Sequence, residues 1–334
     1  MKIRKLLSAV MTFAVMAAAP DYMTAKADEE YISGENDIFK YRAYQDHVEL
    51  TMCKDIKAEV EVPSEIDGLP VTVIYTRAFS YNELLADAVI HEGVIEIQDS
   101  AFYECRSLKR AVLPESLQKL DEWAFAWCTS LESINIPAGV DNIDDYVFTS
   151  CNSLNDIEIA NGVTSISRGA FSYCTSLTDI VLPESVSSIG EIAFECCPSL
   201  DNIVILNPEC EIYDSPSTIS NPISINADYS GLICGFSGST AQAYAEKYGY
   251  AFKAIDNIGD VNLDGAVDAL DASLVLTEYA ASATGKPSVL DDAAKLNADV
   301  NSDGTVDALD ASYILSYYAF RATGGSGNIL EFIE

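Results

Sequence analysis

The sequence has very little histidine and few basic residues. Its 334 residues include two histidines and 19 lysines and arginines against 52 aspartates and glutamates, for a formal net charge of -33 at pH 7. So acidic a chain is repelled by nucleic acid and by anionic membrane surfaces, and we expect neither as a partner. The acidity does not indicate disorder, because 49% of the residues are hydrophobic and 18 are tyrosines.

Recognisable catalytic patterns are also missing. His47 and His91 are far apart in the sequence and are interpreted as ordinary surface imidazoles. No zinc-protease helix motif occurs, and residues 235–239 miss the nucleophile-elbow pattern because the fifth residue is serine. Carboxylates such as Asp156 and Glu158 could hydrolyse glycosides only in a cleft that raises one pKa, and their surroundings predict an open strand surface. We therefore expect no enzymatic activity.

Long apolar runs are confined to the N-terminus. Residues 1–27 begin with three basic residues, continue with an apolar stretch over 6–19 and end in Ala-Lys-Ala. This pattern is typical of a secretory signal peptide with its cleavage site, and the apolar stretch is short for a membrane span. We expect a secreted, extracellular protein without a membrane span.

The middle of the chain repeats every 23 residues. Phenylalanine recurs at this step at Phe79, Phe102, Phe125, Phe148, Phe171 and Phe194, and columns of leucine and isoleucine keep the same step. A period in this range indicates a solenoid, in which each unit stacks on its neighbours to bury its apolar face. Alternation around Ile134 and Ile136 predicts one short strand in a unit.

This unit resembles a known family of repeats. Its pattern is visible at Ala124-Phe125, Cys128, Leu131 and Ile134, and is similar to the 23-residue leucine-rich repeats of bacterial surface proteins. The resemblance covers residues 71–206, about six units, and implies a solenoid of short parallel strands with irregular or helical returns. Most members of the family serve recognition or attachment and are not catalysts.

Both ends of a solenoid must be covered. Alternating polar and apolar residues predict a small β cap over 28–70. The 23-residue step fails after residue 206, so residues 207–255 are assigned to a C-terminal cap with a helix over 241–247 and a strand over 250–254.

Five of the nine cysteines occupy one column of the repeat: Cys105, Cys128, Cys151, Cys174 and Cys197. Many cysteines in a secreted protein indicate a disulfide framework. The first unit, however, has Asn82 at this position, and asparagine and cysteine share the ability to satisfy backbone groups inside a turn. A ladder of buried thiols is therefore favoured over disulfides. A pair among the other four remains open: Cys53, Cys196, Cys210 and Cys234.

Two surfaces of the repeats are candidates for recognition. The outward strand positions form a mixed, acidic face that includes Arg110, Ser133, Asn135, Asp156, Glu158 and Asp179. Aromatic residues collect on the return segments, at Tyr81, Tyr103, Trp123, Trp127, Tyr146 and Tyr173. For these we favour packing at the edge of the core over a polysaccharide platform. A protein ligand on the strand face is the preferred hypothesis, and a polysaccharide ligand is the alternative.

A 12-residue acidic segment occurs twice near the C-terminus, starting at Asp260 and Asp299. Oxygen-bearing side chains at positions 1, 3, 5, 9 and 12, with glycine at position 6, have the spacing of an EF-hand calcium loop. Position 12 is aspartate instead of glutamate, which shortens the bidentate reach. The predicted ligands of two Ca²⁺ ions are Asp260, Asn262, Asp264, Ala266, Asp268 and Asp271, and Asp299, Asn301, Asp303, Thr305, Asp307 and Asp310; Ala266 and Thr305 act through their carbonyls.

Apolar residues at helical spacing predict a helix after each loop, whereas no amphipathic helix enters the first loop. This order, with a linker and a short helix between the copies, resembles an all-α type I dockerin with two calcium-binding loop-helix motifs. The resemblance implies Ca²⁺-dependent binding to a cohesin domain of a scaffoldin, and hence a place at the cell surface in a cellulosome. We assign residues 256–322 to the dockerin and 323–334 to a tail.

In this family, loop positions 10 and 11 and the following helix contact cohesin. The equivalent residues here are Ala269, Leu270, Thr277, Ala308, Leu309 and Ser316. The alternative is that the two leucines pack inside the module. Because both copies match, one or two binding orientations are open.

The sequence thus predicts a non-catalytic, cellulosome-associated protein of polysaccharide breakdown. Its dockerin would anchor it while the repeats recognise a protein or polysaccharide ligand. One alternative is an adhesion protein of the cell surface that does not depend on a scaffoldin. Another is a divergent polysaccharide- or peptide-degrading enzyme with its active site in the caps.

Overall fold

The computed structural model describes residues 30–333 except 55–56, 222–228, 256–257, 263, 291, 302–304 and 326–328. The predicted signal peptide at 1–27 lies outside the described residues. The chain divides into two compact units, one up to residue 234 together with 238–252, the other comprising 235–237 and 253–334. Within the described part, no helix is both long and apolar enough to cross a bilayer.

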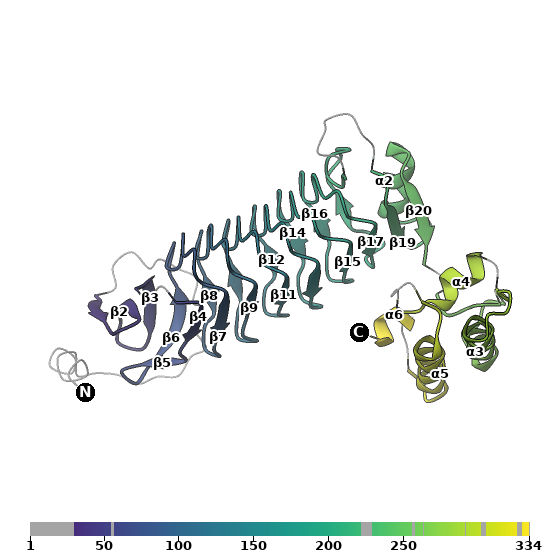
Figure 1. Ribbon diagram of the computed structural model, residues 1–334, viewed down its shortest axis with the longest axis horizontal. Coiled ribbons are helices and arrows are strands. Elements are labelled where there is room, and N and C mark those ends of the chain that lie inside the picture. The colour runs from purple at the N-terminus through teal and green to yellow at the C-terminus, as the bar shows by residue number, and fades with distance from the viewer. Residues whose placement is uncertain are drawn as a thin grey trace. The chain divides into compact units, whose positions relative to one another are not determined.

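The first unit is a solenoid whose turns stack in parallel (Figure 1). Each turn contributes a short strand to one face and a longer strand to the other. The short strands are β8 (Glu96–Ile97), β10 (Lys119–Leu120), β12 (Asn142–Ile143), β14 (Ser165–Ile166), β16 (Ser188–Ile189) and β18 (Glu211–Ile212). The longer strands are β7 (Asp87–Ile90), β9 (Arg110–Val112), β11 (Ser133–Ile136), β13 (Asp156–Ile159), β15 (Asp179–Leu182) and β17 (Asn202–Ile205).

The register of these strands reproduces the sequence period. Ile134 of β11 lies opposite Ile157 of β13, and Ile143 of β12 lies opposite Ile166 of β14. The short strands form one continuous sheet, whereas the longer ones divide between β13 and β15 into a five-stranded and a four-stranded sheet. The predicted leucine-rich-repeat solenoid is confirmed.

A stack of phenylalanine rings fills the interior. Rings of successive turns from Phe79 to Phe194 lie nearly parallel, with centroids 4.6 to 5.8 Å apart, and all are buried. Because each ring packs on the rings before and after it, no turn can complete its core alone.

The column of five cysteines forms a buried thiol ladder beside the rings. The Cys128 thiol donates to the carbonyl of Phe102 at 3.2 Å, and the other four bond in the same way to the phenylalanine 26 residues earlier. Asn82 occupies the position in the first turn, where its side-chain oxygen accepts from the backbone of Leu84 and Leu85. Burial raises the pKa of Cys197 to about 12. These thiols therefore remain protonated at neutral pH.

The return segments between the two strand rows have two left-handed backbone positions in every turn, four residues apart. The first column is Arg77, Ser100, Trp123, Tyr146, Gly169 and Ile192. The second column is Tyr81, Glu104, Trp127, Ser150, Tyr173 and Cys196. Their φ values lie between 53° and 63°, which bulky side chains rarely adopt. Hydrogen bonds to the next turn hold this geometry, such as Trp127 N–H to the Thr149 carbonyl at 2.9 Å.

The solenoid begins before the segment in which the 23-residue step is visible. Strands β1 (Ile32–Glu35), β2 (Phe39–Ala43) and β3 (Val48–Cys53) pair antiparallel in that order, as expected for a β cap. However, β3 also pairs in parallel with β6 (Leu69–Ile74), and β4 (Glu59–Val62) pairs in parallel with β7. The short β5 (Glu65–Ile66) forms a hairpin with β6.

The C-terminal end of the solenoid also continues past residue 206. Strand β19 (Leu232–Gly235) pairs in parallel with β17, and helix α2 (Thr240–Tyr248) and strand β20 (Ala251–Ala254) follow. The predicted helix and strand of this cap are confirmed within one or two residues. Ser239 caps the start of α2 by accepting from the Gln242 N–H, and Gly249, in the left-handed conformation, ends it.

The second unit is helical and contains α3 (Ala269–Ala283), α4 (Asp292–Ala298), α5 (Ala308–Ala322) and α6 (Ile329–Ile333). Helices α3 and α5 pack together, with Val275 and Ile314 fully buried. Val261 and Val300 of the two loops are also buried. Helix α6 lies within the segment that the sequence assigns to the tail, and its Ile329 is buried.

Candidate functional site

The first acidic loop folds around the carboxylate of Asp260. Its two oxygens accept from the backbone N–H groups of Asp264, at 3.1 Å, and Gly265, at 2.9 Å. Asn262 accepts from the Asp264 N–H and donates its amide to the Asp264 carboxylate. Gly265 has φ 88°, which provides the sharp turn expected at position 6. The structure therefore brings together the side chains at positions 1, 3 and 5.

Position 12 has a structural role in both copies. Asp271 is buried; one carboxylate oxygen accepts from Val261 and Asn262 N–H and the other from Asp268 N–H. Because Asp268 in turn accepts from Leu270 N–H, the pair forms the capping box of α3. Burial raises the pKa of the Asp271 carboxyl despite the three N–H donors. This position favours aspartate because its carboxylate must reach both the loop backbone and the first helical turn.

The second loop repeats this arrangement 39 residues later. Asp310 is buried and accepts from Val300 and Asn301 on one oxygen and from Asp307 on the other. Asp307 caps α5 by accepting from Leu309 N–H at 2.6 Å. Predicted ligands Asp299, Asn301 and Thr305 lie in the described part of this loop, whereas Asp303 lies outside the described residues.

The residues present fit a hard cation such as Ca²⁺. Every predicted ligand offers oxygen, with no nitrogen or sulfur donor in the set, and a glycine makes the turn at position 6 of the described first loop. Among the described residues, no three acidic, histidine or cysteine side chains form a metal-binding group by themselves. The amide oxygens and the carbonyls of Ala266 and Thr305 are therefore needed to complete either shell.

The two leucines proposed for partner binding lie at the surface. Leu270 is 63% exposed and Leu309 47% exposed, so the alternative that they pack inside the module is wrong. Each copy exposes a second apolar pair on the following helix, Leu276 with Tyr279 in α3 and Leu315 with Tyr318 in α5. Sequence reasoning missed these pairs; their sign is that α3 and α5 carry more large apolar residues than one buried stripe uses.

One contact breaks the correspondence between the two copies. The Glu278 carboxylate of α3 is buried, and it accepts from the Ser288 hydroxyl at 2.8 Å and from Val289 N–H at 2.7 Å. Burial opposes its ionisation, but these bonds and the nearby Lys295 lower the pKa of Glu278 overall. The equivalent residue of α5 is Tyr317, whose ring packs against Phe332. The linker is thus attached to α3 alone.

Neither histidine belongs to a catalytic arrangement. His91 is half-exposed beside Glu61, as expected for a surface imidazole. For His47 the surface interpretation is wrong: its side chain is 14% exposed, stacks on Tyr44 with ring centroids 4.4 Å apart and bonds to Asp46. Buried Glu49 accepts from the Tyr44 hydroxyl. No serine or cysteine nucleophile is among the contacts described for this group, which closes the end of the first turns.

The outward positions of the longer strands form the expected open face. Asp156, Glu158 and Asp179 are exposed on β13 and β15, and Arg110 pairs with Asp87 of the preceding turn at 3.2 Å. These carboxylates show no enclosed setting that would raise the pKa of one of them. The face therefore suits recognition better than glycoside hydrolysis.

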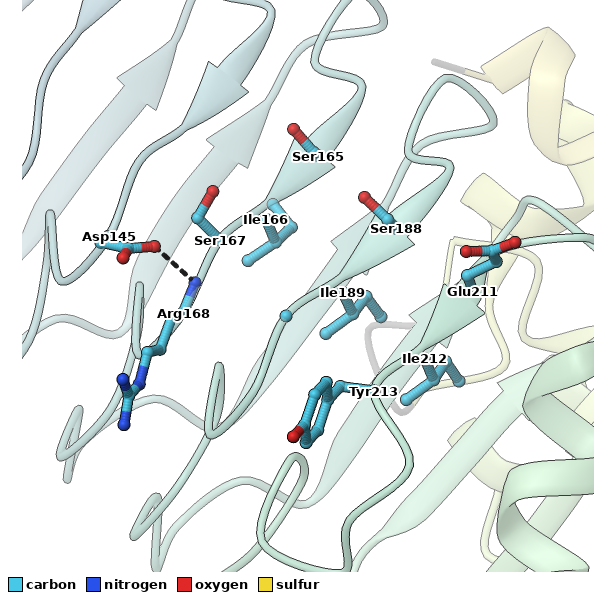
Figure 2. Close-up of a pocket in the computed structure, with 11 residues that line it drawn as sticks. Asp145, Ser165, Ile166, Ser167, Arg168, Ser188, Ile189, Glu211, Ile212 and Tyr213 are labelled. Carbon is cyan, nitrogen blue, oxygen red and sulfur yellow. Dashed lines mark hydrogen bonds between the residues drawn. The ribbon is translucent and has the colours of Figure 1, made fainter.

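The row of short strands carries a shallow groove of about 500 Å³ over β14, β16 and β18. Figure 2 shows Ser165 and Ser188 side by side on neighbouring strands, with Arg168 and Tyr213 nearer the strand ends. The hydroxyls of Ser165 and Ser167 already bond to Asn142. The groove lacks a paired acid and base, so it shows no reaction centre.

Two family models match the chain. One, described as BspA type leucine rich repeat region, matches residues 72–201 in 6 copies. The other, described as dockerin type I domain, matches residues 258–317. The chain thus contains a leucine-rich-repeat region and a type I dockerin domain, as both resemblances predicted. Both are non-catalytic modules of binding or adhesion.

Solved structures of bacterial leucine-rich-repeat proteins are similar to the solenoid. The T. pallidum protein TpLRR is 26% identical, with a TM-score of 0.51, over 66% of this chain and 98% of that chain. A Bacteroides capillosus protein is 26% identical, with a TM-score of 0.35, over 39% of this chain and 99% of that chain. A leucine rich cell surface protein from Faecalibacterium prausnitzii is 18% identical, with a TM-score of 0.36, over 57% and 75%. No curated protein matched the chain.

Proposed function

We propose that this chain is a non-catalytic, extracellular component of a cellulosome. Its dockerin would bind a cohesin domain of a scaffoldin in the presence of Ca²⁺, and its repeats would recognise a ligand. The observation that carries the proposal is the pair of matching acidic loops, each continuous with a capped helix that exposes an apolar residue.

The acidic loops link calcium to docking. Each loop gathers carboxylates that repel one another without a cation, and the aspartate at position 12 joins the loop backbone to the first turn of the helix. A bound ion would supply two positive charges and fix the start of the helix, where Leu270 or Leu309 is exposed. Calcium and partner binding are therefore expected to be thermodynamically coupled.

The docking residues are Ala269, Leu270 and Thr277 in one copy and Ala308, Leu309 and Ser316 in the other. Exposed leucines beside small residues provide an apolar centre that a partner can cover, whereas the surrounding loop is acidic and hydrated. The attachment of the linker to α3 alone makes the two orientations of the partner unequal.

The proposal is tested by retention of the full-length protein on immobilised type I cohesins. Retention is expected in millimolar Ca²⁺ and not in excess chelator. The double variant Leu270→Ala with Leu309→Ala should lose retention, because both apolar centres are removed. Val289→Ala is the matched control, since Val289 is 53% exposed but lies outside the docking set.

Retention that persists in chelator, or in the double leucine variant, would contradict the proposed docking mechanism. Turnover of a polysaccharide or peptide by the purified protein would contradict the non-catalytic assignment. Binding to cells or fibre with no cohesin retention would favour the adhesion alternative.

A further inference from the structure

Three aromatic residues of the return segments form a regular exposed row. Tyr81, Trp127 and Tyr173 belong to the second left-handed column, and their exposures are 60%, 41% and 45%. They occupy every second turn, and Glu104 and Ser150 lie at the same position of the turns between. For these three residues, the expectation of packing at the edge of the core is wrong.

The backbone fixes the spacing of this row. Each member of the column donates its N–H to the next turn: Tyr81 to the Tyr103 carbonyl at 2.8 Å, Trp127 to Thr149 at 2.9 Å and Tyr173 to Glu195 at 2.7 Å. Turns hydrogen-bonded in this way are about 4.8 Å apart, as in a parallel sheet, so aromatics on alternate turns are about 10 Å apart. Their shared φ, between 61° and 63°, makes the three side chains leave the backbone in the same direction.

The other aromatic column shows what packing looks like in this fold. Trp123 stacks on Tyr146 with ring centroids 4.4 Å apart. Tyr146 in turn covers Gly169, where any Cβ would collide with its ring. These rings lie along the ladder and shield it, whereas Tyr81, Trp127 and Tyr173 leave large apolar surface in water. Single exposed aromatics are ordinary, but a periodic row indicates a binding surface.

The surroundings of the row select the chemistry of a ligand. Thr129, Asn152 and Thr175 border it with neutral hydrogen-bonding groups; Asn152 donates to the Thr175 hydroxyl at 3.3 Å. The ion pair between Arg106 and Glu104 lies between the first two aromatics. With a net charge of -33, the protein disfavours an anionic chain. The row thus combines flat apolar surfaces, neutral polar groups and rejection of negative charge.

A sugar chain with β-1,4 linkages meets these conditions. Its rings present apolar C–H faces to aromatic rings and hydroxyls to the polar border. Successive rings are flipped, so the same face recurs at every second sugar, as the aromatics recur at every second turn. A proline-rich peptide is disfavoured, because such peptides insert into slots between neighbouring aromatic side chains, and here single rings stand apart.

We infer that Tyr81, Trp127 and Tyr173 form a binding platform for an extended, neutral β-1,4-linked polysaccharide. The platform runs about 20 Å along the solenoid, four hydrogen-bonded steps. The inference deepens the recognition role of the repeats in the proposed function and rests on it. It places the ligand on the return edge, away from the strand face favoured by the sequence.

The test measures binding of cellohexaose and amorphous cellulose to the full-length protein with Ca²⁺ present. Saturable binding is expected, with a change in tryptophan fluorescence because Trp127 is one of only two tryptophans. Trp127→Ser should weaken binding roughly fivefold to tenfold, and the triple variant Tyr81→Ser, Trp127→Ser, Tyr173→Ser should abolish it. Serine is compatible with this backbone because Ser150 occupies the same column.

Two controls separate loss of the platform from loss of the fold. Tyr213→Ser removes an equally exposed tyrosine, 48% exposed, outside the row, and should leave binding unchanged. Trp127→Tyr should retain binding. Thermal melting of each variant should match that of the wild-type protein within a few degrees.

The inference is overturned if neither cellulose probe binds, if the triple variant binds as the wild type does, or if Tyr213→Ser loses binding equally. Stronger binding of poly-L-proline or polygalacturonate would identify a different ligand class and also overturn it. Retention of the triple variant on cohesin should be unaffected. Failure of the sugar test therefore leaves docking intact, and failure of docking leaves the sugar test readable.

Discussion

At the scale of single residues, the acidic composition produces one strained carboxylate in the repeats. Asp144 follows β12, accepts from the side-chain amide of Asn142 and faces Asp121 of the preceding turn. Partial burial, with repulsion from Asp121, raises the pKa of Asp144 to about 6, although Lys119 opposes the shift. The folded state therefore favours the protonated acid more than the unfolded chain does.

We predict that Asp144→Asn stabilises the solenoid at pH 7 by about 1 kcal/mol, discounted for solvent screening. The contribution of the wild-type carboxyl is fully present below its unfolded pKa and is lost as the pH rises through about 6. The variant should therefore melt higher than the wild type at pH 7 and equally near pH 4. Asp156→Asn, on the exposed strand face, is the control; an equal gain in both variants would indicate a general effect of net charge.

At the scale of elements, the capping aspartates join each acidic loop to its helix. We predict that Asp310→Ala destabilises the helical unit by about 1–3 kcal/mol even in excess chelator. The reason is that the N–H groups of Val300 and Asp307 lose a buried acceptor. Urea unfolding followed by helical circular dichroism measures the change. Leu309→Ala, at the exposed neighbour, should alter stability by less than about 0.5 kcal/mol.

How far the sequence predicts these elements depends on how many positions repeat the signal. The phenylalanine column and the two acidic loops are each repeated, so strands, turns and helix starts follow directly. The outer solenoid turns escape this reasoning, because Leu50 and Ile74 pair 24 residues apart and Val62 and Ile90 pair 28 apart. Insertions of this kind alter the step without altering the ladder.

The candidate sites show a different limit. Donor types and spacing predict the calcium ligands, since chemistry selects the residues directly. Exposure of an aromatic ring instead depends on its neighbour: Tyr146 lies flat because Gly169 leaves room, and Tyr81 has no such seat. The six return-segment aromatics look alike in the sequence, although they divide between packing and solvent.

At the scale of the whole molecule, the two units differ in what stabilises them. We predict that chelator lowers the melting temperature of the helical unit and leaves that of the solenoid unchanged. The ion binds only the folded loops, and free Ca²⁺ at a hundred times its Kd would contribute about 2.7 kcal/mol. Calorimetry should show two transitions in Ca²⁺, of which one moves. A shift of both would mean that the units do not unfold independently.

The alternation along the second left-handed column makes two turns, instead of one, the inherited unit of that edge. Insertion or loss of a single 23-residue module between Tyr81 and Trp127 would preserve the fold but put the rings on either side out of phase. A change of two modules would keep the phase. Descendants of this chain that use the edge should therefore differ in length by even numbers of modules.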